Sequence, residues 1–261
     1  MVIAAFCGFK SLAAENEAPA ATQWQGKKVG VLGDSMSAPT DNPDRKRFYS
    51  YLADSIGIEP LVYAVSGYQW KDLAGLARQM RSDHGDDIDA ILIWAGTNDY
   101  NASRPVGTFF TETTEEVNVN GRVMPRRHRT HVMADSTFCG SINLIMSYLK
   151  ENYPTKQIVI LTPVHRAFAR FGDDNIQPDE MYANGAGFYI DDYVAALKRA
   201  GEVWSVPVID LFSISGYYPL YDSNIIYVQN GATDRLHPSK EGHLRLARTL
   251  QYQLRSLPAT F

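Results

Sequence analysis

Apolar and polar residues follow two different rhythms along the chain. Short, nearly continuous runs of Val, Ile and Leu are typical of strands that are buried on both faces. Between these runs, apolar residues recur every three or four positions, as they do on one face of a helix. The predicted strands are 28–32, 61–65, 88–94, 157–161 and 206–211, and the predicted helices are 48–56, 71–81, 136–152, 189–204 and a last one after Ser239, which can cap it.

Buried strands that alternate with helices predict a parallel sheet with helices on both faces. We therefore expect an α/β fold with a doubly wound, mainly parallel five-stranded sheet in the flavodoxin-like order. The chain has 261 residues, of which 45% are hydrophobic and 21% charged, so it can bury one substantial core. No linker divides it, which predicts a single domain over residues 24–261.

Two long connections interrupt the alternation, at about residues 100–135 and 163–187. In the first, Asn120-Gly121 lies between alternating residues and predicts a hairpin with a type I′ turn. The second is rich in aromatic residues and glycine and has no helical period. Long loops in a compact domain are usually functional or disordered. Both leave the sheet at the carboxyl ends of strands, so we expect both to wall a functional crevice.

The first 23 residues are expected to lie outside the fold. An apolar run at residues 2–9 precedes Ala13 and Ala14, as in the later part of a secretory signal. This favours an exported protein. A basic segment before the run is lacking, so a cytoplasmic protein with a loose leader is the alternative. No other segment approaches the roughly 20 apolar residues that a membrane span needs.

Charge and cysteine content narrow the classes of function. The formal net charge of −4 gives no global electrostatic reason to bind nucleic acid or an anionic membrane. Cys7 and Cys139 lack the spacing of a metal site, and Cys139 falls in a helical pattern that favours a buried thiol. Three arginines around His128 and His131 would repel a cation there. We therefore predict no metal site.

Chemically useful residues follow the predicted strands. Ser35, Gly67 and Asn98 come after the first, second and third strands, and Asp234 precedes His237 by three residues near the end of the chain. The carboxyl ends of parallel strands converge on one crevice. A serine needs a base to act as a nucleophile at neutral pH, and the base needs an orienting partner. The sequence therefore contains the minimum set for acyl transfer by a hydroxyl group.

Each of these residues also has a purely structural explanation. Ser35 could cap the helix that follows it, and Gly67 and Asn98 could be turn residues. His237 could be an ordinary loop histidine. Their occurrence together favours the catalytic interpretation.

Four sequence blocks resemble those of the SGNH hydrolase superfamily, which includes the GDSL esterases. Gly33-Asp34-Ser35-Met36 matches the first block, with methionine in place of the usual leucine. Gly67 matches the second block, Gly96-Thr97-Asn98-Asp99 the third and Asp234-Arg235-Leu236-His237 the fourth. The blocks run from residue 33 to residue 237, so the resemblance spans most of the chain.

The resemblance implies a catalytic triad of Ser35, His237 and Asp234. It also implies an oxyanion hole made of the backbone N–H groups of Ser35 and Gly67 and the side-chain amide of Asn98. No metal or organic cofactor is required for this chemistry.

Other residues are expected to support or line this site. Asp34 and Asp99 are expected to hold the catalytic loops through hydrogen bonds to the backbone. Trp70 and His165 are candidates to line the substrate crevice. Nothing in the sequence sets the oligomeric state.

The function that follows is that of a serine esterase acting on small acyl esters, including O-acetyl groups on carbohydrate, through an acyl-enzyme. The narrowing to carbohydrate rests on the resemblance and on the exported character, not on a particular residue. Three alternatives stay open: a lipase or lysophospholipase for longer acyl chains, a sugar O-acyltransferase, and a non-catalytic carbohydrate-binding module.

Overall fold

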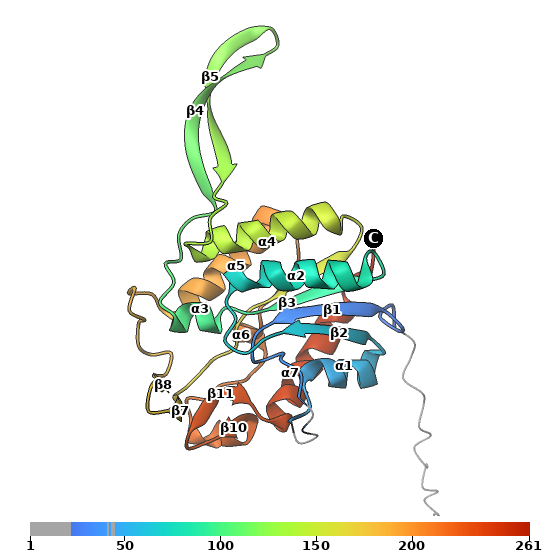
Figure 1. The fold of residues 1–261 in the computed structure, drawn as a ribbon, viewed down its shortest axis with the longest axis vertical. Helices are drawn as coiled ribbons and strands as arrows, with labels where there is room; N and C mark the ends of the chain where they lie inside the picture. Colours follow the sequence, from blue (N-terminus) through green and yellow to red (C-terminus); the bar gives the residue numbers. More distant parts are fainter. Residues whose placement is uncertain (1–21, 41, 43–44) are drawn as a thin grey trace, which may run out of the picture.

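The computed structural model describes residues 22–40, 42 and 45–261 (Figure 1). The expected leader therefore falls almost wholly outside the described residues. Thr22 and Gln23 are already part of the domain, because Thr22 Oγ1 donates to the carbonyl of Ile56 at 2.9 Å and Gln23 Nε2 to that of Leu257 at 2.8 Å. The expected boundary at residue 24 is too late by these two residues.

The centre of the molecule is a five-stranded parallel sheet in the order β2-β1-β3-β6-β9. Its strands are β1 (Lys28–Gly33), β2 (Glu59–Ala64), β3 (Ala90–Trp94), β6 (Gln157–Leu161) and β9 (Val208–Ile209). The predicted doubly wound, flavodoxin-like sheet is thus confirmed. In this order the chain reverses direction across the sheet between β1 and β3, which is where such folds bind ligands.

Helices cover both faces of the sheet, as the alternation predicts. Helices α1 (Phe48–Ile56) and α7 (Lys240–Arg255) pack together on one face. The other face carries α2 (Trp70–His84), α4 (Phe138–Asn152) and α5 (Ile190–Trp204), and Figure 1 shows the two layers on either side of the strands. None of the helices in the described part of the chain is both long and apolar enough to cross a membrane.

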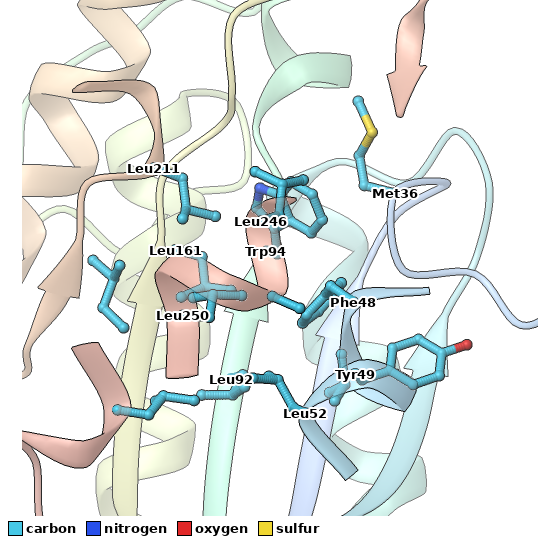
Figure 2. Close-up of a cluster of buried hydrophobic side chains, with 14 of the residues drawn as sticks. Met36, Phe48, Tyr49, Leu52, Leu92, Trp94, Leu161, Leu211, Leu246 and Leu250 are labelled. Atoms are coloured by element: carbon cyan, nitrogen blue, oxygen red, sulfur yellow. The ribbon is translucent and has the colours of Figure 1, made fainter. Parts of the chain in front are cut away.

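Successive strand residues point to opposite layers and give the molecule two hydrophobic cores. Leu92 faces α1 and α7 and packs in the cluster of Figure 2 with Phe48 and Leu250. Its neighbours Ile91 and Ile93 belong to the other core, beneath α2, α4 and α5. Each strand is therefore apolar on both sides, which explains why the strands appear in the sequence as unbroken apolar runs.

A second, four-stranded sheet lies at the carboxyl end of the central one, in the order β10-β11-β7-β8. Its strands are β7 (Ala169–Gly172), β8 (Asn175–Gln177), β10 (Val228–Asn230) and β11 (Asp234–Pro238). The sequence did not predict it. These strands have three to five residues, too few for an alternating pattern to stand out, and β7 pairs with β11 across some 60 residues of chain.

The long connection after β3 begins with α3 (Thr97–Asn101) and then forms a hairpin of β4 (Phe110–Val119) and β5 (Arg122–His131). Asn120 and Gly121 at its tip have φ angles of 53° and 82°. Positive φ at both central residues defines the predicted type I′ turn, which is confirmed. The hairpin projects from the body beyond α4, at the top of Figure 1. The remaining short elements are α6 (Leu211–Ile214) and the 3₁₀ helix η2 (Asp222–Tyr227).

Candidate active site

Ser35 lies in a tight turn directly after β1. The carbonyl of Asp34 accepts hydrogen bonds from Ser37 N at 3.0 Å and Ala38 N at 2.9 Å, and its carboxylate Oδ1 accepts from Met36 N at 2.9 Å. Met36, which replaces the usual leucine, is 3% exposed and anchors the turn in the core (Figure 2). These bonds hold the Ser35 side chain at the mouth of the crevice between β1 and β3.

His237 approaches Ser35 from the second sheet. The two residues are 202 positions apart in sequence, yet His237 Nε2 lies 2.9 Å from Ser35 Oγ. His237 Nδ1 lies 2.9 Å and 3.1 Å from the two carboxylate oxygens of Asp234. Both residues belong to β11. The structure thus brings the three residues of the predicted triad into one hydrogen-bonded line.

The Asp234 carboxylate fixes the protonation pattern of the imidazole. An ionised carboxylate only accepts, so Nδ1 carries the proton and Nε2 is left to accept the Ser35 hydroxyl proton. Asp234 is 6% exposed, and its Oδ1 also accepts from the backbone N–H of Leu236 at 3.2 Å and of His237 at 3.0 Å. The three-residue spacing between Asp234 and His237 therefore brings the carboxylate to the imidazole ring and also lets backbone N–H groups fix its orientation.

The three groups expected to form the oxyanion hole belong to residues that line one pocket, Ser35, Gly67 and Asn98. The backbone amides of Ser35 and Gly67 have no protein acceptor in the described part of the chain, and both residues line the pocket. Asn98 Nδ2 donates to the carbonyl of Tyr68 at 3.0 Å and lies 3.4 Å from Asp34 Oδ2. The second hydrogen bond is longer than an ordinary N–H···O bond and is the weaker of the two.

Asp34 and Asp99 are buried and bond to the backbone, as expected of supporting residues. Both oxygens of Asp99 accept from Trp70 N, the first residue of α2, at 3.1 and 3.3 Å. Burial raises the pKa of Asp99 to about 8. Burial likewise raises the pKa of Asp34 to about 6, although its hydrogen bond from Met36 N–H works in the opposite direction.

The side chains of Ser35, Asn98 and His237 line one pocket, which has a volume of about 260 Å³. Its walls come from the ends of β1, β2 and β3 and from the second sheet, and they combine polar side chains with the apolar surfaces of Phe171 and Leu236. The lining residues are Ser35, Ser66, Gly67, Asn98, Phe171, Asn175, Gln177, Leu236 and His237.

Residues 163–187 wall this pocket, as expected, through Phe171, Asn175 and Gln177 of the β7–β8 segment. The ring of Phe171 stands edge-on to that of His237, with centroids 5.4 Å apart. The sequence did not predict these three residues as part of the site. The only available signal was their place in a long aromatic loop, because the function of each depends on the pairing of β7 with β11.

The matching expectation for residues 100–135 is wrong. No residue of this segment lines the pocket at Ser35. The base of the hairpin is fixed to the helices instead: His131 stacks on Trp204 of α5 at 4.6 Å, and Asn143 of α4 donates to the carbonyls of Phe109 and Val132 at 2.8 and 3.0 Å. This anchorage directs the hairpin away from the crevice.

The two aromatic candidates for substrate contact do not lie in the pocket either. Trp70 is fully buried; its Nε1 donates to the carbonyl of Ala95 at 3.2 Å and its ring packs edge-on against Phe138. His165 Nδ1 lies 2.5 Å from Glu180 Oε1, and its ring packs on Phe212 with centroids 3.7 Å apart. Trp70 is covered by apolar partners and His165 is held by Glu180 and Phe212, so both side chains have structural roles.

The remaining histidine and cysteine candidates are also structural. His128 Nδ1 lies 3.0 Å from Glu115 on the neighbouring strand of the exposed hairpin. Cys139 is buried in α4 as a free thiol, as predicted, and burial raises its pKa to about 12. Within the described residues, no three His, Cys, Asp or Glu side chains cluster in a way that could hold a metal ion.

Solved structures similar to the chain share its fold. A protein from Lactobacillus plantarum matches with a TM-score of 0.68 at 23% identity over 89% of this chain and 98% of that one. A lipase/acylhydrolase from Enterococcus faecalis gives 0.54 at 17% identity over 89% and 98%. A catalytic mutant of an acetylxylan esterase from Geobacillus stearothermophilus gives 0.51 at 17% identity over 88% and 94%. No curated protein matches significantly.

Family membership comes from the sequence as a whole. The model of the GDSL-like lipase/acylhydrolase family matches residues 31–245, a stretch that includes Ser35, Asn98 and His237. This confirms the resemblance to SGNH hydrolases, in agreement with the fold. The chain belongs to the GDSL-like lipase/acylhydrolase family and is a carboxylic ester hydrolase.

Proposed function

We propose that the protein hydrolyses small acyl esters, including O-acetyl groups on carbohydrate, with Ser35 as the nucleophile. The alignment of Ser35 Oγ, His237 and Asp234, with 2.9 Å at each junction and an opening onto a small pocket, is the observation that carries this proposal. A nucleophile, its base and an orienting carboxylate in hydrogen-bond reach are the recognised signature of a serine hydrolase.

The reaction follows from this alignment. His237 Nε2 takes the Ser35 hydroxyl proton while Oγ attacks the ester carbonyl, and the oxygen that becomes negative turns toward Ser35 N–H, Gly67 N–H and the Asn98 amide. The proton on His237 then passes to the leaving alcohol, and the acyl group stays on Ser35. A water molecule deprotonated by His237 attacks the acyl-enzyme, which releases the carboxylic acid and restores Ser35.

The size of the pocket supports a short acyl group, and the amide and hydroxyl groups on its walls support an alcohol that carries polar groups. The volume of about 260 Å³ is below the range of about 300–1,000 Å³ that is typical of sites for drug-sized ligands. Amide and hydroxyl side chains outnumber apolar ones on its walls. One neighbour in fold is named an acetylxylan esterase, and another an acetyl-xylooligosaccharide esterase. These names support an acetylated carbohydrate as the substrate class.

A hydrolysis screen tests the proposal. We expect kcat/KM for 4-nitrophenyl esters to be highest for acetate and to fall steadily toward palmitate, and we expect acetate release from acetylated xylan. A maximum at octanoate or longer would instead favour a lipase or lysophospholipase. Acylation of added sugar in preference to water would favour an acyltransferase. No turnover, together with no labelling of Ser35 by a serine-directed phosphonate, would favour a binding module.

A further inference from the structure

Two amide side chains of β8 share the pocket with Ser35. Asn175 and Gln177 are two residues apart on the same strand, so they lie on the same side of it, and both line the pocket. Ile176 between them is on the opposite side and is 53% exposed. Amide groups can present either donors or acceptors to a ligand, so what they recognise depends on what holds their other ends.

Arg166 fixes the orientation of Gln177. It is 1% exposed, and its Nη2 donates to Gln177 Oε1 at 2.8 Å, while Nη1 lies 3.3 Å from Thr97 Oγ1. The guanidinium also lies over the ring of Tyr100, 5.2 Å from its centroid. A guanidinium has only donors. Gln177 must therefore turn its oxygen toward Arg166 and its NH₂ group away from it.

The same logic passes from Gln177 to Asn175. Gln177 Nε2 lies 2.9 Å from Asn175 Oδ1 and donates to it. This occupies one of the two acceptor positions of the Asn175 oxygen and orients the amide, and Nδ2 is left without an acceptor in the described part of the chain. Asn175 is exposed at the pocket wall, so these unpaired N–H groups are accessible to a ligand.

The segment that carries Asn175 lies on the leaving-group side of the site. Strand β7 pairs with β11 at Ala169 and Asp234, and Phe171 lies against His237. The alcohol must lie beside His237 Nε2, which supplies its proton. The acyl oxygen lies on the other side, toward the amides at the ends of β2 and β3.

We propose that Asn175 Nδ2 donates a hydrogen bond to an oxygen of the alcohol part of the ester, and that Arg166 and Gln177 are positioning residues that keep this donor facing the pocket. The preferred substrates are therefore esters of alcohols that carry a hydroxyl or ether oxygen close to the ester, as polyols and sugars do. This inference rests on the proposed ester hydrolysis at Ser35.

Two acetates that differ in one group test it. 2-Hydroxyethyl acetate and propyl acetate have alcohol parts of the same length. Only the alcohol part of the first carries a hydroxyl oxygen, besides the ester oxygens, that can accept a hydrogen bond. We expect kcat/KM for 2-hydroxyethyl acetate to exceed that for propyl acetate about three- to tenfold, the effect of one neutral hydrogen bond. Asn175→Ala should bring this ratio close to one, because the donor is lost.

Gln177→Glu should have the same effect without touching Asn175. The new carboxylate keeps its contact with Arg166 but has no N–H to offer Asn175. The Asn175 amide then donates to the carboxylate and presents its carbonyl oxygen to the pocket. Ile176→Ala, on the other side of the same strand, is the matched control and should keep the ratio of the unaltered protein.

The outcomes separate this inference from the proposed function. Equal kcat/KM for the two acetates in the unaltered protein would overturn the subsite and leave ester hydrolysis intact. A loss of activity on both acetates with an unchanged ratio in Asn175→Ala and Gln177→Glu would also overturn it, since a merely structural role predicts that result. If neither acetate is hydrolysed, both this inference and the proposed function are overturned.

Discussion

Asp99 is an acid placed where its charge is poorly solvated. It is fully buried next to the N-terminus of α2, and burial raises its pKa to about 8. In the unfolded chain the same group would titrate near its ordinary value of 3.8. Between these two values the folded protein holds a proton that the unfolded chain has released, so Asp99 links stability to pH.

The direction of this link is testable with Asp99→Asn. The contribution of Asp99 to stability is fully present below about pH 4 and is lost as the pH rises toward 8, because ionisation then favours the unfolded chain. Asparagine keeps an acceptor for Trp70 N–H but does not titrate. The free energy of unfolding of the unaltered protein, minus that of the variant, should therefore fall steadily from pH 5 to pH 8 in urea denaturation. A difference that stays constant over this range would contradict the prediction.

The contact between Ser35 and His237 predicts that their contributions are not additive. Ser35→Ala should lower kcat for 4-nitrophenyl acetate by a factor on the order of 10³ to 10⁶, and His237→Ala nearly as much. The double variant should be little worse than either, because each residue is useless without the other. Steady-state kinetics on the four proteins, with thermal denaturation as the control for folding, measures this. Losses that multiply would show that the two residues act independently.

Asn98 makes a different prediction, because its amide matters when charge develops on oxygen. Asn98→Ala should lower kcat about 10²- to 10³-fold and leave KM little changed. The amide also holds the carbonyl of Tyr68 at 3.0 Å, so the melting temperature must be measured alongside. A raised KM with an unchanged kcat would instead make Asn98 a residue that positions the substrate.

Single functional residues could be predicted from the sequence where their chemistry requires a fixed spacing along the chain. Asp234 and His237 are three residues apart on one short strand, and Ser35 follows directly after β1, so both could be found from sequence. Trp70 could not be judged in the same way. Its place near a strand end suggested a crevice, but whether an indole faces solvent or core depends on partners such as Phe138, which lies far away in sequence.

Helices and strands could be predicted from the sequence when they were long and when a local signal marked where they end. Helix α1 begins and ends where the apolar spacing predicts, and Gly57 closes it with a left-handed φ of 76°. The strands of the second sheet have no such signals. Asp234 pairs with Ala169, which lies far away in sequence, so tertiary structure rather than local pattern defines β7 and β11.

Ser239 at the start of α7 allows a test of a local signal. As predicted, it caps the helix: its Oγ accepts from Gly242 N at 3.1 Å, and it also donates to the carbonyl of Ile226 at 2.7 Å. Ser239→Ala should lower the free energy of unfolding by about 1 kcal/mol, the usual effect of losing an N-cap. Ser239→Asp keeps the cap but not the bond to Ile226, so urea denaturation should place it between the other two proteins. Equal losses in both variants would mean that the bond to Ile226, and not the cap, is what matters.

On the scale of the whole molecule, the β4–β5 hairpin stands apart from the rest. Its strands pair with each other along ten residues each, and nearly all of their side chains are exposed. Cross-strand ion pairs join Glu112 to Arg127 and Arg129. Exposed pairs of this kind add little stability, and a lone two-stranded hairpin is marginal in water. Its contacts with the body are concentrated at the base, where His131 stacks on Trp204.

The separation between hairpin and pocket predicts that most of the hairpin is dispensable for hydrolysis. Thr113 and His128 are paired in register, as Val119 and Arg122 are at the natural turn. Replacing residues 114–127 with Asn-Gly should therefore close a shorter hairpin and keep the base intact. We expect kcat/KM for 4-nitrophenyl acetate to change less than about twofold and the free energy of unfolding by less than about 1 kcal/mol, because only exposed pairs are removed.

Replacing residues 172–175 of the β7–β8 segment with Asn-Gly is the matched comparison, and it should impair turnover of 2-hydroxyethyl acetate more than that of propyl acetate. If the shortened β4–β5 hairpin lost most activity on both esters while remaining folded, the hairpin would have to reach the substrate in a way that its anchorage on α4 and α5 does not allow.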